Sequence, residues 1–123
     1  MVTFGVSMIP DRMKITKKSS EIVKSLKGKL GMNPNILCRI ALAISIENDD
    51  KKIPATENSS GLEFTKSTLF GDTALVFEIM IFNQYGALDK NGLVNIINQH
   101  IESGLKKINA NKSFRSFFEN TKI

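Results

Sequence analysis

The chain has 123 residues, of which 41% are hydrophobic and 24% are charged, and its formal net charge is +5. This length fits one domain, residues 1–123, and the composition is that of a folded domain rather than a disordered chain. No stretch reaches the roughly 18 apolar residues of a membrane span, and no signal-peptide pattern precedes residue 10, so we expect a cytoplasmic protein without a membrane contact. A single cysteine excludes an internal disulfide.

The N-terminal third predicts a short strand and a helix. Residues 12–16 alternate polar and apolar side chains, which is the period of a strand, and Thr16 is expected on the polar, outward face. A helix is expected from Lys18 or Ser19 to Leu30, with one apolar face and lysines on the others. It should end at Gly31, because glycine readily adopts the left-handed conformation of a helix C-cap.

A second helix is expected from Pro34 to about Ile46. Pro34 suits the first helical position, where its missing N–H has no intrahelical partner, and the Asn33 side chain is expected to cap the helix. Apolar residues surround this helix on all sides, which indicates burial, including burial against another copy of the chain.

The remaining chain predicts further helices after a polar linker. The expected elements are the linker at 47–60, an extended segment at 62–70, a helix at 73–85 capped by Asp72 and closed by Gly86, a helix at 92–109, and a short aromatic helix at 113–118. We therefore predict a mainly α fold with a short N-terminal strand, a helix pair and further C-terminal helices. Residues 61–123 would form a helical assembly part, because their aromatic and aliphatic residues exceed the core of a small DNA-binding unit.

The positive charge is concentrated in residues 11–39. This segment has two acidic residues, Asp11 and Glu21, and a net charge of +6, whereas the rest of the chain has a net charge of −1. Its eight basic residues are Arg12, Lys14, Lys17, Lys18, Lys24, Lys27, Lys29 and Arg39. A concentrated basic segment favours a polyanionic partner, of which nucleic acid is the commonest.

The strand and helix pair of residues 12–46 resembles the ribbon-helix-helix DNA-binding unit. The resemblance rests on the alternating strand, the G-x-N turn at residues 31–33 and the order of the elements. It implies that two chains pair their strands into a ribbon that faces DNA, with Arg12, Lys14 and Thr16 outward. The free amides at the start of the second helix, near Asn33, would bind a phosphate.

A wider resemblance comes from the string NPNILCRIALAISIE followed, after the linker, by GLEFTKSTLFGD. These stretches are similar to the DndE family, the small subunit of bacterial DNA phosphorothioation systems. The resemblance implies a non-catalytic, mostly helical homotetramer without a cofactor that binds duplex DNA, preferably nicked, through surface lysines. It also implies partners that transfer sulfur and hydrolyse ATP.

The lysines also have an ordinary interpretation as a solvated helix face, which is as plausible as DNA contact for Lys24, Lys27 and Lys29. For Lys14, Lys17 and Lys18 DNA contact is favoured, and we expect these three to supply most of the affinity. Because lysine binds phosphate as a point charge, the pattern favours binding to the DNA backbone over recognition of a base sequence.

Three other residues have simple interpretations or remain open. Cys38 lies in an apolar helix and is expected to be a buried small hydrophobe, and His100 is expected on a helix surface. Arg39 either reaches the surface, or pairs with Glu47 or with a carboxylate of another chain, or binds phosphate near the turn.

Two non-enzymatic alternatives remain open beside the accessory protein of phosphorothioation. One is a ribbon-helix-helix repressor or antitoxin, and the other is a protein-interaction scaffold with an incidental basic face. An enzyme is disfavoured, because the sequence contains no recognisable acid–base, metal or nucleophile motif.

Overall fold

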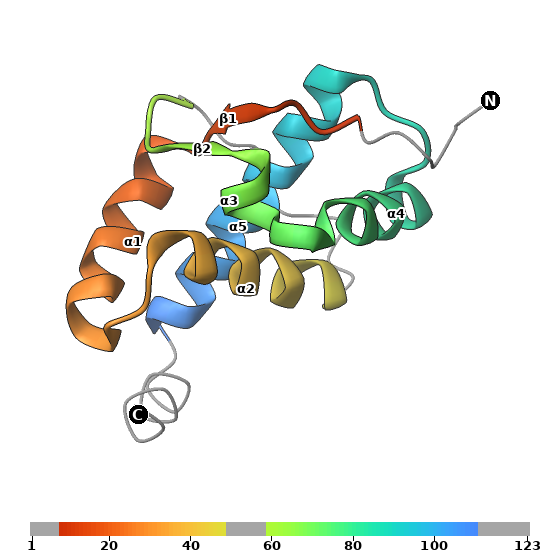
Figure 1. The fold of residues 1–123 in the computed structure, drawn as a ribbon. Coiled ribbons are helices and arrows are strands. Elements are labelled where there is room, and N and C mark those ends of the chain that lie inside the picture. Colours follow the sequence, from red (N-terminus) through yellow and green to blue (C-terminus); the bar gives the residue numbers. More distant parts are fainter. Residues whose placement is uncertain (1–7, 49–58, 111–123) are drawn as a thin grey trace.

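The computed structural model describes residues 8–48 and 59–110, and this part of the chain is mainly α (Figure 1). Its elements are β1 (Arg12–Lys14), α1 (Lys17–Leu30), α2 (Pro34–Glu47), β2 (Glu63–Thr65), α3 (Lys66–Phe70), the 3₁₀ turn η1 (Gly71–Thr73), α4 (Ala74–Tyr85) and α5 (Lys90–Ala110). The predicted fold class is confirmed. Most of the predicted linker and the predicted helix at 113–118 lie outside the described residues.

The core forms where α2 crosses α5. Figure 1 shows α1 and α4 on opposite sides of the molecule, with α2 and α5 between them. The two helices can approach closely because Gly104 of α5 has no side chain. A Cβ at this position would lie 2.0 Å from the carbonyl oxygen of Ala41 in α2. Within the described residues, no helix is both long and apolar enough to cross a membrane.

The two N-terminal helices follow the sequence prediction closely. The apolar face of α1 is buried, and Gly31 caps the helix in the left-handed conformation with a φ of 70°. Helix α2 begins at Pro34 as predicted, but the Asn33 side chain makes no capping hydrogen bond, so that part of the prediction is wrong. The backbone carbonyl of Asn33 nevertheless accepts the first helical bond, from the Leu37 amide at 3.1 Å.

The prediction that β1 pairs with the same strand of a second chain is wrong, because β1 pairs with β2 of its own chain. The pairing is antiparallel, with Met13 opposite Phe64 and Lys14 opposite Glu63. It continues past β1, because the Ile15 amide donates to the Leu62 carbonyl and the Gly61 amide donates to the Ile15 carbonyl, both at 2.9 Å.

Thr16 is buried rather than outward-facing. Its side chain caps α1 by accepting from the Ser19 amide at 3.0 Å, and its hydroxyl lies 2.8 Å from Glu102 Oε1 of α5. By accepting from the Ser19 amide, the hydroxyl satisfies one of the free amides of the first turn, and α1 begins at Lys17 rather than at the predicted Lys18 or Ser19.

Three predictions in the second half are also corrected. Only residues 63–65 of the segment 62–70 are extended, because Thr65 caps α3 through the Thr68 amide. Asp72 lies within η1 and does not cap α4. His100 has no solvent exposure, because α5 is the central helix and this position faces α2 and α4.

Candidate nucleic-acid interface

Helix α1 carries the most concentrated positive charge of the described surface. It has five lysines and one acidic residue, Glu21, and all six side chains are exposed. The lysines are Lys17, Lys18, Lys24, Lys27 and Lys29. Because Ile22, Val23 and Leu26 turn the opposite side of the helix into the core, these charges are held on one face. We call the six exposed charged residues of α1 the basic face.

The β-ribbon is less basic than the strand sequence suggested. Arg12 and Lys14 are exposed as predicted, but pairing with β2 sets Glu63 directly opposite Lys14. The Arg12 guanidinium also lies 4.0 Å from the Glu63 carboxylate, and Lys66 lies 3.9 Å from Asp11. Although such exposed pairs contribute little stability, they reduce the net charge that the ribbon presents. The structure therefore shifts the strongest charge from the ribbon to α1.

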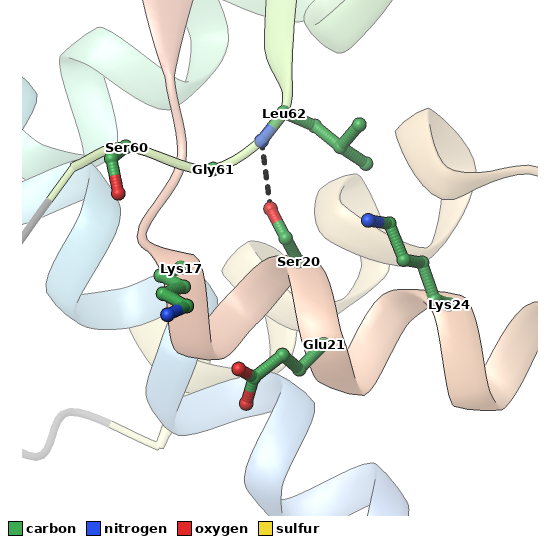
Figure 2. Close-up of a pocket in the computed structure, with 7 residues that line it drawn as sticks. All are labelled: Lys17, Ser20, Glu21, Lys24, Ser60, Gly61 and Leu62. Carbon is green, nitrogen blue, oxygen red and sulfur yellow. Dashed lines mark hydrogen bonds between the residues drawn. The ribbon is translucent and has the colours of Figure 1, made fainter.

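A pocket of about 570 Å³ lies between the first turns of α1 and the segment that leads into β2. It is lined by Lys17, Ser20, Glu21, Lys24, Ser60, Gly61 and Leu62. Figure 2 shows Lys17 and Lys24 on either side of Ser20, with the Ser60–Leu62 segment facing them. Its size lies within the range of roughly 300–1,000 Å³ that is typical of ligand sites.

A hydrogen bond and a glycine set the width of this pocket. The Leu62 amide donates to Ser20 Oγ at 2.7 Å, which ties the segment to α1 (Figure 2). A Cβ at Gly61 would lie 2.1 Å from that same oxygen and 2.4 Å from the Thr16 carbonyl oxygen, so only glycine permits this approach. The hydrogen bond and the close approach therefore fix the Ser60–Leu62 segment beside α1, next to Lys17 and Lys24.

All eight residues predicted to contact DNA are exposed, and the pocket brings two of them together. They are Arg12, Lys14, Lys17, Lys18, Lys24, Lys27, Lys29 and Asn33. The sequence prediction missed Ser20, Ser60 and Gly61, which complete the pocket around Lys17 and Lys24. The available signal was the alternation at residues 62–65, which could have been matched to the first strand.

Arg39 has a partner that neither sequence-based interpretation named. Its guanidinium donates from Nε to the Leu69 carbonyl at 3.0 Å and from Nη2 to the Thr68 carbonyl at 3.2 Å. Asn35 Nδ2 donates to the same Thr68 oxygen at 3.0 Å. Since these carbonyls belong to the end of α3, Arg39 stabilises that helix end and fixes α3 against α2.

Cys38 and His100 are both buried in the core. The burial of Cys38 confirms the prediction, and it raises the pKa of the thiol to about 12, which disfavours a thiolate. His100 lies 2.7 Å from Ser45 Oγ through Nδ1 and 2.7 Å from the Tyr85 hydroxyl through Nε2. Because Ser45 and His100 have no exposed surface, this cluster links α2, α4 and α5 instead of meeting a substrate. The described residues also contain no cluster of three or more His, Cys, Asp or Glu that could hold a metal ion.

Comparison with known proteins identifies the family. The family model of the DNA sulphur modification protein DndE matches residues 12–116, a range that includes the ribbon, the basic face and the pocket. The chain belongs to the DndE family. Membership connects it with DNA phosphorothioation, and no curated protein matches the sequence.

Two solved DndE structures are similar to this chain. The DndE protein from Escherichia coli B7A, described as involved in DNA phosphorothioation modification, has 30% sequence identity and a TM-score of 0.76. That match covers 83% of this chain and 98% of the Escherichia coli chain. A DndE mutant with two glycines changed to lysine, also described as involved in DNA phosphorothioation, has 28% identity and a TM-score of 0.74, with coverage of 82% and 99%. Both DndE chains are matched over nearly their whole length.

Proposed function

We propose that this chain is a non-catalytic DNA-binding accessory protein of DNA phosphorothioation that binds the backbone of duplex DNA. The basic face supports the proposal, because five exposed lysines share one helix side with a single carboxylate. The proposed contacts are Arg12, Lys14, Lys17, Lys18, Lys24, Lys27, Lys29 and Asn33, with most of the affinity from α1. Membership of the DndE family supports DNA phosphorothioation as the process in which this binding takes part.

Backbone recognition fits the side chains of this surface better than base reading does. Lysine offers a flexible point charge, whereas base edges are read mainly by the bidentate fork of arginine or by Asn and Gln amides. Arg12, the one arginine among the proposed contacts, lies 4.0 Å from the Glu63 carboxylate. We therefore rank a sequence-specific repressor or antitoxin second, and we expect nicked and continuous duplexes to bind without regard to sequence.

We also propose that the chain forms a homo-oligomer, and the family resemblance implies a tetramer. The exposed side of α4 supports this part of the proposal. Leu75, Val76 and Ile79 are 37%, 56% and 36% exposed. Glu78, the only charged residue of α4, is buried and accepts hydrogen bonds from the amides of Met8 and Ile9. An uncharged apolar helix face suits a second copy of the same face.

The remaining partners follow from the process. We propose that the chain works in the cytoplasm with the subunits that transfer sulfur and hydrolyse ATP, since its described residues supply an exposed basic surface while Cys38 is buried. In this arrangement it would hold the DNA while another subunit modifies the phosphate.

A salt series on four DNAs tests the function. Intact duplex, nicked duplex, single-stranded DNA and a second duplex of scrambled sequence are titrated with the protein at several salt concentrations. Backbone binding predicts similar Kd values for the two intact duplexes and a linear fall of log affinity with log salt. A preference for one sequence would support the repressor, and an absence of salt-dependent binding would refute the proposed function.

A further inference from the structure

The pocket beside α1 combines opposite charges in a way that the rest of the basic face does not. Of its seven lining residues, Lys17 and Lys24 are positive and Glu21 is negative, so the formal charge of the lining is +1. In the described part of the chain, Glu21 forms no ion pair within 4.0 Å of either lysine. The negative charge of Glu21 is therefore not neutralised by an ion pair with Lys17 or Lys24, and it repels an anion that enters the pocket.

The positions of the three charges follow from the helix. Lys17 and Lys24 are seven residues apart, about 10.5 Å along the axis, and Glu21 falls between them on the same exposed side. Figure 2 shows the two lysines flanking Ser20, while the Glu21 carboxylate lies on the side of the helix away from the Ser60–Leu62 segment in this view. An anion in the pocket is thus attracted by the two lysines and repelled by Glu21.

Two kinds of phosphate in DNA differ in the charge that they bring to such a pocket. An internal phosphodiester carries one negative charge, whereas a phosphomonoester such as a terminal phosphate carries about 1.5 to 2 at pH 7. Attraction to the site rises in proportion to the charge of the ligand, but the hydration lost on entry rises with its square. A weakly positive site therefore disfavours the dianion more than a strongly positive site does.

We propose that the pocket binds one internal phosphodiester of the DNA backbone and that Glu21 is a specificity-determining residue that selects against terminal phosphates. This inference rests on the proposed DNA binding and adds to it the chemical form of phosphate that the pocket accepts. Removing the Glu21 charge should raise affinity for both forms, and more for the terminal phosphate.

The size of the effect follows from Coulomb attraction in water. At a separation of roughly 7 Å, one unit charge changes the affinity for a monoanion by about threefold and for a dianion by about eightfold at low salt. The test compares Glu21→Gln with the wild type on three duplexes of one sequence, which are continuous, nicked with a 5′-hydroxyl, and nicked with a 5′-phosphate. Glu47→Gln is the matched control, because Glu47 is also an exposed carboxylate, at the C-terminal end of α2, and its loss changes the net charge by the same amount.

We expect Glu21→Gln to bind the continuous duplex about threefold more tightly and to favour the 5′-phosphate nick over the 5′-hydroxyl nick by about twofold or more relative to the wild type. Glu47→Gln should leave that ratio unchanged. A Glu21→Gln ratio equal to that of the wild type would overturn the charge-selection role.

A second variant tests whether the pocket holds phosphate at all. Lys24→Gln should weaken binding to all three duplexes, whereas Lys90→Gln at the start of α5 should not. Equal affinities for these two variants would overturn the phosphate site while leaving salt-dependent binding by the wild type intact. Loss of all salt-dependent binding in the wild type would instead refute the proposed function itself.

Discussion

Replacing Lys17 and Lys24 together by glutamine tests whether α1 supplies the DNA contacts. Both ammonium groups line the pocket beside α1, and both side chains are exposed, so the change removes two charges without disturbing the core. Each phosphate of duplex DNA that the protein neutralises adds about 0.9 to the slope of log affinity against log salt. Because we propose that the two lysines hold one phosphate between them, we expect the slope of the double variant to fall by about 0.9.

The same numbers give a difference that a binding titration can measure. A fourfold rise in salt, from about 50 to 200 mM, weakens one such phosphate contact by about half a decade, so the wild type should lose about half a decade more affinity than the variant over this range. Fluorescence anisotropy on one labelled duplex at four salt concentrations measures both slopes.

Lys90→Gln with Lys107→Gln is the matched control for this experiment. Both lysines are exposed on α5, and their removal lowers the net charge of the protein by the same amount. The reasoning is refuted if the control lowers the slope as much as the α1 variant does, or if the α1 variant keeps the wild-type slope. The first result would mean that DNA binding depends on the total charge of the protein, and the second that it depends on another surface.

Three further predictions concern the core and the assembly. Gly104→Ala should lower the free energy of unfolding by about 1 to 3 kcal/mol, because its Cβ would overlap the Ala41 carbonyl; an unchanged denaturant midpoint would contradict the close crossing. Cys38 should react with a thiol reagent at neutral pH only after denaturant is added, since its pKa is about 12, and rapid labelling of the native protein would show that it is accessible. Val76→Glu with Ile79→Glu should shift the sedimentation of the oligomer toward monomer without lowering helicity, whereas an unchanged sedimentation coefficient would exclude this face.

Local periodicity predicted most of the helices because their signals lie within a few residues of one another. The four-residue spacing of Ile22, Leu26 and Leu30 gave the buried side of α1, and the glycines at 31 and 86 marked two helix ends that the structure confirms. The end of a helix depends on backbone conformations next to it in sequence, so a single sequence contains the information.

Contacts between distant segments could not be predicted in the same way. The partner of β1 begins about fifty residues later, and a strand of three residues does not reveal whether it pairs within the chain or with another copy. Likewise, the exposure of His100 depended on which side of α5 meets Ser45 and Tyr85, and Thr16 was misplaced because strand alternation was extended into the cap of α1.

The in-chain ribbon changes how the basic charge can meet DNA. A ribbon that reads a groove needs outward side chains with fixed hydrogen-bonding geometry, but here Lys14 faces Glu63 across the strands and Arg12 lies near the same carboxylate. Helix α1 has the opposite character, since its lysines are exposed, flexible and held on one side by a buried apolar face. Long flexible cations can follow a phosphate backbone whatever its bases are, so the location of the charge on α1 is itself a reason to expect binding that is sensitive to salt and indifferent to sequence.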